Sequence, residues 1–340
     1  CPTIRRMSQG PITSTINNMA DVWEAYRDEL DGVECQVRAN LDSSVALVNT
    51  VAGHILNSGG KRIRPLLLLL SARLCGYTGR DHHQLGSLVE FIHTATLLHD
   101  DVVDDADIRR GQRTARKVWG NQISILVGDY LYSKAICQVV DFRNQGINEV
   151  LSDACKKMAE GEVLQLYYNG NPAMPEADYF KIVEHKTAGL IAAACRMGAI
   201  LADATEAQQD ALFQFGQHLG IAFQVADDTL DYTANGERLG KTLGQDLRQG
   251  KATLPLLHLL HHCSEQDKRM IIDRMETRTL TEEDLGRLIR LMNDAGSIAY
   301  AADRAKSYID EAQRDLSLFE DCTAKRALSV AADYMVTRDR

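Results

Sequence analysis

The chain has 340 residues and a formal net charge of −9, from 38 basic and 47 acidic side chains. A field of that sign repels phosphodiester backbones and anionic lipid surfaces, so we expect no nucleic-acid partner. Apolar residues make up 45% of the sequence and aromatic residues only 6%, which excludes a disordered chain and disfavours an aromatic-rich β-sandwich.

Helical periodicity dominates the sequence. Proline, which breaks helix interiors, does not occur between Pro65 and Pro172, so long helices are permitted. The predicted helices cover 13–31, 35–57, 63–76, 81–105, 121–142, 147–168, 176–202, 206–234, 253–262, 265–276, 281–293, 296–316 and 323–338. We expect one all-α domain over 13–340, a single large helical bundle around a central cavity, after a disordered or tag-like segment 1–12.

The expected compartment is the cytoplasm. The eight cysteines are scattered without a C-x-x-C pair, as in reduced cytosolic proteins. The apolar stretch 66–70 is too short to span a bilayer, and no secretory signal pattern opens the sequence. We therefore expect no stable membrane insertion.

Two acidic DDxxD motifs follow apolar helical runs. They are Asp100, Asp101 and Asp104 in the first, and Asp227, Asp228 and Asp231 in the second. Helical positions i and i+4 lie about 40° apart, so the first and last aspartates of each motif share one face. Oxygen-only ligands suit a hard divalent ion, and Mg²⁺ is favoured where a phosphate shares the coordination.

A single motif of this kind is more simply explained as a solvated acidic helix end, although like charges at that spacing destabilise an isolated helix. Two copies, each preceded by an apolar run, favour binding of a metal–diphosphate. Two helices that present these faces across a cavity would hold ions bridging one diphosphate.

Basic residues that could receive phosphate lie near glycines and near the first motif. The turn 59–65 contains Lys61 and Arg64 and opens a helix, where free N–H groups favour anions. Arg109 and Arg110 follow the first motif, and simple charge balance for the aspartates is their alternative role. Later candidates are Lys241 and Lys251, which could instead be solvent-exposed. Lys186 with Thr187 is a further candidate, a polar pair in an otherwise apolar helix, where buried polar groups would need a partner.

The order of these elements resembles that of the trans-isoprenyl diphosphate synthases. The matching segments are GGKRIRP at 59–65, LLHDDVVDDADIRRG at 97–111, GDYLYS at 128–133, Lys186-Thr187, FQVADDTLD at 223–231 and GKTLGQDLRQGKATLP at 240–255. EGEVLQL at 160–166 and the terminal 338–340 are similar to bacterial octaprenyl-type, long-chain members. The resemblance runs from about residue 40 to 260 and implies the isoprenoid synthase fold.

The resemblance implies head-to-tail 1′–4 condensation of isopentenyl diphosphate onto an allylic diphosphate, for which farnesyl or geranylgeranyl diphosphate is the expected primer. It also implies about three Mg²⁺ ions acting with the bound diphosphate. Two of them would lie on Asp100 and Asp104, and one on Asp227 with Asp231. Asp101 and Asp228 complete the two catalytic motifs.

The resemblance assigns the remaining site residues by substrate. Those matching positions that hold the allylic diphosphate are Arg109, Lys186, Lys241 and Lys251. Those matching positions that hold isopentenyl diphosphate are Lys61, Arg64, His93 and Arg110. Thr187 and Gln224 match groups whose oxygens stabilise the allylic cation. Helical geometry independently places His93 two turns before Asp100 on the same face, and a hydrogen-bonded core histidine is its alternative role.

Product length in this family depends on the tunnel below the first motif. Short-chain members usually carry bulky aromatic residues four and five positions before its first aspartate, where this sequence has Thr96 and Ala95. We therefore expect a long-chain product near C40. The rival interpretation is a geranylgeranyl- or farnesyl-type synthase. A non-catalytic regulatory subunit is a less favoured interpretation. Such subunits tend to lose aspartates of the two motifs, whereas both motifs are complete in this sequence.

Two further expectations concern partners and metals. The resemblance implies a homodimer formed through apolar helices, and release of a long apolar product could involve transient membrane association. The pairs His82-His83 and His261-His262 lack a plausible set of metal partners in the sequence, so we interpret them as surface or loop residues.

Overall fold

The structure is a computed structural model that describes residues 16–233 and 244–337. Its contacts divide the chain into two compact units, which we describe separately. Unit 1 comprises Cys1–Ser152, Ala193–Leu212 and Phe319–Val330, and unit 2 comprises Asp153–Ala192, Phe213–Leu318 and Ala331–Arg340. The prediction of one domain over 13–340 stays a prediction, and the segment 1–12 lies outside the described residues.

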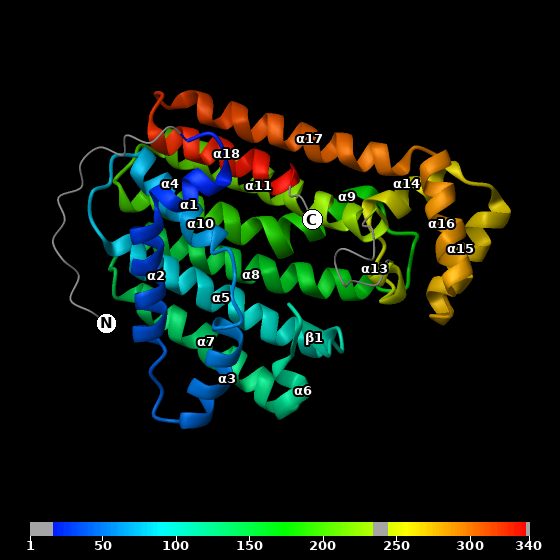
Figure 1. The fold of residues 1–340 in the computed structure, drawn as a ribbon, viewed down its shortest axis with the longest axis horizontal. Helices are drawn as coiled ribbons and strands as arrows, with labels where there is room; N and C mark the ends of the chain where they lie inside the picture. Colours follow the sequence, from blue (N-terminus) through cyan, green and yellow to red (C-terminus); the bar gives the residue numbers. More distant parts are fainter. Residues whose placement is uncertain (1–15, 234–243, 338–340) are drawn as a thin grey trace. The chain divides into compact units, whose positions relative to one another are not determined.

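Unit 1 is built around a long central helix. Its elements are α1 (Met19–Ala25), α2 (Arg27–Asn40), α3 (Ala46–Leu56), α4 (Ile63–Leu74), α5 (Asp81–Val103), β1 (Ile108–Arg109), β2 (Gln112–Arg113), α6 (Ala115–Trp119) and α7 (Asn121–Val140). Helix α5 packs against α2, α4 and α7 (Figure 1). The five leucines 66–70 of α4 are completely buried, so this helix contributes core on every side.

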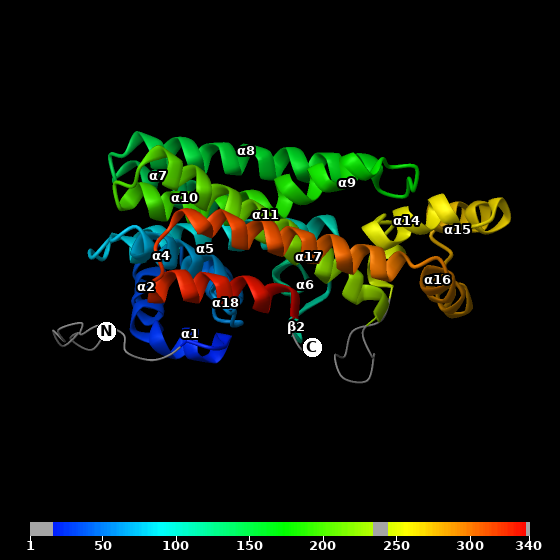
Figure 2. The ribbon, with the colours of Figure 1, turned by 90° about the horizontal axis from the view of Figure 1, so that it is seen from above.

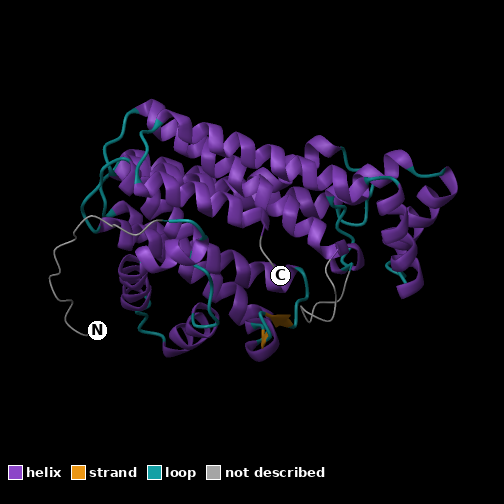
Figure 3. Ribbon diagram, turned by 45° about the horizontal axis from the view of Figure 1, so that its top comes forward, coloured by secondary structure: helices purple, strands orange, loops and turns teal. Residues whose placement is uncertain are grey.

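Unit 2 is also helical. Its elements, some of which begin or end in unit 1, are α8 (Gln145–Tyr168), α9 (Glu176–Val183), the π-helix η1 (Glu184–Ala188), α10 (Gly189–Leu201), α11 (Glu206–Thr233), α13 (Gln245–Arg248), α14 (Leu254–His262), α15 (Glu265–Thr277), α16 (Glu282–Asp294), α17 (Ser297–Asp315), the 3₁₀ helix η2 (Leu316–Leu318) and α18 (Thr323–Thr337). Helix α17 packs against α14 and α16 (Figure 2). The all-α prediction is confirmed, and the only strands in the described ranges form one short hairpin (Figure 3).

The predicted boundaries are wrong at the N-terminal end. The predicted helices 13–31 and 35–57 are three shorter helices, α1 to α3. The break before α3 is made by the side chain of Asn49, which accepts from the Ser43 N–H at 3.0 Å and donates to the Ser43 carbonyl at 2.9 Å. Such a bridge satisfies backbone groups outside a helix, and apolar periodicity does not detect it.

Prolines stand at the starts of helices, as their chemistry requires. Pro65 lies in the first turn of α4, Pro175 precedes α9, and Pro255 is the second residue of α14. The first turn of a helix has N–H groups without intrahelical partners, so a residue lacking an N–H costs little there. The helices between them run without such interruptions.

Helix α7 is unusually apolar for its exposure. It is the one helix in the described ranges whose length and composition would allow it to cross a membrane, and 33% of the apolar window is buried. It packs along α5, but Ile125, Leu126 and Val140 on it are exposed. Such a helix is more simply a soluble helix with one uncovered face than a membrane span.

Candidate active site

The first acidic motif lies at the C-terminal end of α5 in unit 1. Asp104 caps the helix, and its N–H donates to the Asp100 carbonyl at 2.8 Å. Both side chains are partly buried. Asp101, in contrast, is only 1% exposed. The motif therefore divides into two carboxylates on one side of the helix end and one that points into the protein.

Asp101 holds Arg109. The Arg109 Nε donates to Asp101 Oδ1 at 2.8 Å, whereas Asp101 Oδ2 has no hydrogen-bond partner. Burial raises the pKa of the Asp101 carboxyl, and the Arg109 charge partly offsets that rise. In this structure the contact links the end of α5 to strand β1.

The segment after the motif folds into a hairpin that the sequence reasoning missed. Ile108 pairs with Arg113, and Arg109 pairs with Gln112. The connecting residues, Arg110 and Gly111, have φ values of 51° and 75°. Positive φ at both central positions is the signature of a type I′ turn, whose twist suits two antiparallel strands. Two-residue strands are too short for a period-two pattern, so the Arg-Gly pair is the only local signal.

The glycine turn 59–65 meets this hairpin. The Arg110 guanidinium donates to the Gly59 carbonyl. A Cβ on Gly60 would come within 3.2 Å of Arg110 Nη1, so the absence of a side chain there lets the guanidinium lie close to the turn. Two predicted basic elements, far apart in the sequence, therefore contact each other within unit 1.

Arg62 anchors the glycine turn. Its backbone is left-handed, with φ of 47°. Its guanidinium pairs with Glu34, with Glu90 at 2.8 Å, and donates to the Leu56 carbonyl at 2.9 Å. Arg62 thus has an internal structural role, while the neighbouring Lys61 is exposed.

The four residues predicted to hold isopentenyl diphosphate all belong to unit 1. Desolvation and the positive charges of Arg64 and Arg110 hold the pKa of His93 well below its usual range. These guanidinium groups are therefore close enough to act on the imidazole, which is neutral at pH 7 in this environment. Lys61 lies three residues before Arg64 on the same turn. Three predicted cationic residues and this histidine therefore belong to the same unit, in spite of the net negative charge of the chain.

The second acidic motif lies near the C-terminal end of α11 in unit 2. Asp227 is exposed, and Asp228 is only 7% exposed. Asp231 accepts from the Gln245 N–H at 3.1 Å and the Asp246 N–H at 2.9 Å, so it caps the short helix α13. Asp227 and Asp231 share a helix face as predicted, but Asp231 is engaged by backbone donors.

A hydrogen-bonded chain connects the predicted cation-stabilising residues to Asp228. The Thr187 hydroxyl donates to Gln224 Oε1 at 2.8 Å, and Gln224 Nε2 donates to Asp228 Oδ1 at 2.7 Å. The Tyr179 hydroxyl donates to Asp228 Oδ2 at 2.6 Å. Burial and the Asp246 charge raise the pKa of Asp228, and the bonds from Tyr179 and Gln224 act in the opposite direction.

Lys186 and Thr187 lie in the π-helix η1, a feature the sequence did not indicate. The Lys186 ammonium pairs with Glu162 and donates to Gln165 Oε1 at 2.7 Å. A Cβ on Gly161 would lie 2.9 Å from the Lys186 N, so the glycine allows α8 to approach this segment. Single π-turns inside α-helices are frequent at functional sites.

A family profile described as polyprenyl synthetase matches residues 45–292, which is most of the chain. The chain belongs to the polyprenyl synthetase family. It is 41% identical to octaprenyl diphosphate synthase of Escherichia coli (strain K12) over 328 residues, which are 95% of this chain and 100% of that protein. It is 38% identical to an all-trans-nonaprenyl-diphosphate synthase (geranyl-diphosphate specific) of Rhodobacter capsulatus, over 91% of this chain and 94% of that protein.

Solved structures agree with this assignment. The polyprenyl synthase from Caulobacter crescentus CB15, complexed with calcium and isoprenyl diphosphate, matches with a TM-score of 0.90 and 38% identity, covering 96% of this chain and 99% of that one. The predicted family and the isoprenoid synthase fold are confirmed. The protein is a trans-prenyl diphosphate synthase, and hence a prenyltransferase.

The chain-length candidates of this prenyl diphosphate synthase lie within α5. Ala95 is completely buried, and Thr96 is partly buried with its hydroxyl donating to the His93 carbonyl at 2.8 Å. Phe91, one helical turn earlier, is also completely buried. Of the remaining predicted residues, Lys251 is partly buried after α13, and Lys241 lies outside the described residues.

The interpretation of His82 and His83 as surface or loop residues is wrong. His82 is completely buried, and both imidazoles bond to Glu29 Oε2, at 2.8 Å and 2.7 Å. Arg73 pairs with Glu29 Oε1 at 2.5 Å. Because the carboxylate already neutralises this guanidinium and accepts from both rings, we interpret the cluster as a structural tie between α2 and α5.

Sequence reasoning also missed residues that support the site. They are Tyr179 and Asp246 around the second motif, and Glu162 and Gln165 around Lys186. Asp246 lies in the family-like segment 240–255, and Glu162 and Gln165 lie in the family-like segment 160–166. Their acidic or amide side chains were the only sequence feature that could have indicated a supporting role. Nothing in the spacing of Tyr179 marks it.

Proposed function

We propose that this prenyltransferase is an Mg²⁺-dependent, long-chain all-trans polyprenyl diphosphate synthase with a product near C40. The observation that carries the product length is the small buried side chain of Ala95 on α5, five residues before Asp100. The identity to an octaprenyl diphosphate synthase supports it. The proposed primer is farnesyl or geranylgeranyl diphosphate, to which isopentenyl diphosphate is added.

Unit 1 supplies the proposed isopentenyl diphosphate site. Lys61, Arg64 and Arg110 provide cations, and His93 provides an uncharged N–H beside them. A neutral imidazole donates a hydrogen bond to phosphate without adding to the repulsion among the guanidinium groups. Binding of a diphosphate would in turn relieve the repulsion that lowers the pKa of His93.

The acidic motifs fit Mg²⁺. Asp100 and Asp104 offer only oxygen donors at one helix end, and Asp227 offers another exposed carboxylate. Oxygen donors with room for phosphate and water are what this ion requires. When bound, about three such ions would supply Lewis-acid neutralisation of the leaving diphosphate. From the family resemblance, the proposed cationic contacts to the allylic diphosphate are Arg109, Lys186, Lys241 and Lys251.

Unit 2 supplies the proposed contacts to the developing allylic cation. The oxygens of Thr187 and Gln224 are fixed by hydrogen bonds, so they would need little reorganisation as positive charge develops. Preorganised dipoles of this kind account for much of the rate enhancement in electrostatic catalysis. No side chain needs to remove the final proton if the departed diphosphate accepts it.

We also propose that the enzyme works as a homodimer and that α7 contributes to the interface. The side chains of Leu126 and Val140 on this helix are 62% and 57% exposed. A helix of such apolar composition is expected to be mostly buried in a stable assembly. A second copy would cover such a face. Location in the cytoplasm, with transient membrane association during product release, stays a prediction.

The test is the product formed from isopentenyl diphosphate with each short allylic primer in the presence of Mg²⁺, identified by mass spectrometry. We expect an all-trans product near C40 from farnesyl diphosphate. A product ending at C15 or C20 would support the short- or medium-chain alternative. An inactive purified chain that gains activity with a second protein would instead support a regulatory subunit.

A further inference from the structure

We infer that Tyr179 is a positioning residue for prenyl transfer, which acts through Asp228 on the amide orientation of Gln224. This inference rests on the proposed role of Gln224 and Thr187 beside the allylic cation. Tyr179 lies on α9 and Asp228 on α11, so the hydroxyl fixes a residue of the second motif from a separate helix. The tyrosine is 4% exposed.

The geometry of the hydrogen bonds fixes the orientation of the Gln224 amide. Its Nε2 faces Asp228 and donates to Oδ1 at 2.7 Å. Its Oε1 is then directed to Thr187, whose hydroxyl donates to it. A carbonyl oxygen has two lone pairs, so Oε1 keeps one for a developing positive charge.

The opposite orientation of the amide would be harmful to the reaction. If the Gln224 amide rotated by half a turn, N–H groups would take the place of Oε1 and present partial positive charge. Stabilisation of a cation depends on the sign of these fixed dipoles. The hydrogen bond from Gln224 Nε2 to Asp228 Oδ1 therefore sets the sign of the dipole beside Thr187.

Tyr179 keeps that carboxylate in place. Asp228 Oδ1 faces Gln224 and Oδ2 faces the Tyr179 hydroxyl at 2.6 Å, so the two donors use one oxygen each. Without the hydroxyl, a buried oxygen loses its donor and the carboxylate is free to rotate away from Gln224. The proposed role of the tyrosine is positioning, because its hydroxyl acts on Gln224 through Asp228.

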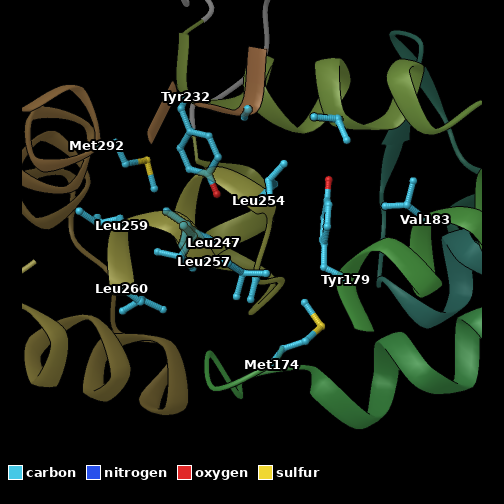
Figure 4. Packing of buried hydrophobic residues seen from close by; sticks show 14 of the residues in the cluster. Met174, Tyr179, Val183, Tyr232, Leu247, Leu254, Leu257, Leu259, Leu260 and Met292 are labelled. Carbon is cyan, nitrogen blue, oxygen red and sulfur yellow. The ribbon is translucent and has the colours of Figure 1, made fainter. Parts of the chain in front are cut away.

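The chain offers a matched control in Tyr232. Both tyrosines belong to the same buried cluster, and Figure 4 shows their hydroxyls pointing in opposite directions. The Tyr232 hydroxyl bonds to Thr253 Oγ1 at 2.6 Å. Tyr232→Phe therefore removes an equally buried, hydrogen-bonded hydroxyl close to the same motif without touching Asp228.

The test compares Tyr179→Phe, Tyr232→Phe, Gln224→Ala and the double variant Tyr179→Phe/Gln224→Ala in the full-length enzyme. We measure kcat and KM for isopentenyl diphosphate at saturating Mg²⁺, and the thermal midpoint of each variant. Tyr179→Phe should lower kcat by about tenfold to hundredfold, as displaced catalytic groups do, while KM changes by less than about threefold. Tyr232→Phe should leave kcat near the wild-type value, even if its thermal midpoint falls as much as that of Tyr179→Phe.

In the double variant, Tyr179→Phe should cause almost no further loss beyond Gln224→Ala, because both changes remove the same dipole. Equal kcat values for the two Phe variants, or additive losses in the double variant, would overturn the inference. The wild-type enzyme in the same assay tests the proposed function separately. A wild-type product of another length would contradict only the proposed chain length, since the kcat ratios are unaffected.

Discussion

Arg109 Nε donates to Asp101 Oδ1 at 2.8 Å, and this carboxylate is almost completely buried. Asp104, three residues later in the same motif, is partly exposed at the helix end. The middle aspartate of the second motif, Asp228, is likewise buried and bonded to protein groups. In both motifs the second aspartate, Asp101 or Asp228, therefore makes contacts within the protein. The first aspartate, Asp100 or Asp227, is more accessible to solvent.

This difference predicts distinct effects of two alanine variants. Asp101→Ala should lower the free energy of unfolding by about 1–3 kcal/mol, because the hairpin loses its charged hydrogen bond. The Mg²⁺ concentration that gives half-maximal activity should stay unchanged. Asp104→Ala, the matched variant, should raise that concentration at least tenfold with a smaller effect on stability. Denaturant unfolding and Mg²⁺ titrations of activity measure both, and an equally raised Mg²⁺ requirement in Asp101→Ala would show that Asp101 is a ligand.

A second prediction concerns Gly161. A Cβ there would lie 2.8 Å from the His185 Cβ and 2.9 Å from the Lys186 N, so Gly161→Ala must displace the π-helix. We expect a loss of about 1–3 kcal/mol in stability and at least a tenfold lower kcat. Gly53→Ala is the control, because its Cβ would meet only the Asn57 side chain at 3.6 Å. That helical change should be neutral or stabilising by about 0.5–1 kcal/mol, and equal behaviour of the two variants would contradict the close approach.

A third prediction tests the tunnel. Ala95→Phe places an aromatic ring below the first motif and should shift the main product to C20 or shorter. Mass spectrometry of the products gives the distribution. The first condensation on a short allylic primer is the control, and its rate should fall less than about tenfold, because in the proposed tunnel the ring lies beyond the reacting atoms. An unchanged distribution with normal activity would rule out this assignment of Ala95.

A fourth prediction follows from the buried His82. Burial lowers its pKa below the usual value near 6.5, so the unfolded chain takes up a proton that the folded protein resists. This contribution to stability is complete above about pH 6.5 and is lost as the pH falls below it. Burial alone would raise the pKa of Glu29, but its bonds from His82, His83 and Arg73 leave it lowered, so its contribution is lost at still lower pH.

Thermal midpoints measured between pH 8 and pH 5 test this. The wild-type midpoint should fall with decreasing pH below 6.5. His82→Asn should make the thermal midpoint fall less steeply with decreasing pH in that range, whatever its effect on the midpoint at pH 8. His261→Asn, at an exposed histidine of α14, is the matched histidine substitution outside this cluster. A wild-type slope in both variants would mean that another group is responsible.

The helical periodicity of apolar residues predicted most helices correctly, because a local repeat of apolar residues marks the buried face of a helix. It placed Asp100 and Asp227 at the ends of apolar runs, where the structure has them on α5 and α11. It failed where a few side chains decide the backbone, as Asn49 does before α3. The hairpin at Arg110 depends on two residues with positive φ, which is too little sequence for a pattern.

The site was predictable to the extent that its chemistry lies in charged residues at recognisable spacings. Lys186 and Thr187 stood out as a polar pair, but the sequence did not indicate the π-helix that carries them or its close packing against Gly161. Tyr179 gave no signal, because its hydroxyl acquires a partner only when α9 packs beside α11. Residues that support a site through tertiary contacts have no local pattern, and they were found only from the structure.

The inward-facing Arg62 has a consequence for how this sequence can change. Its guanidinium reaches Glu34 on α2, Glu90 on α5 and the carbonyl of Leu56, the last residue of α3, so one side chain joins three helices. A lysine has one ammonium group and cannot make these separate contacts. Lys61, next to it, is exposed. Within one short turn, one basic side chain therefore faces solvent, while its neighbour ties three helices together and constrains which residues can replace it.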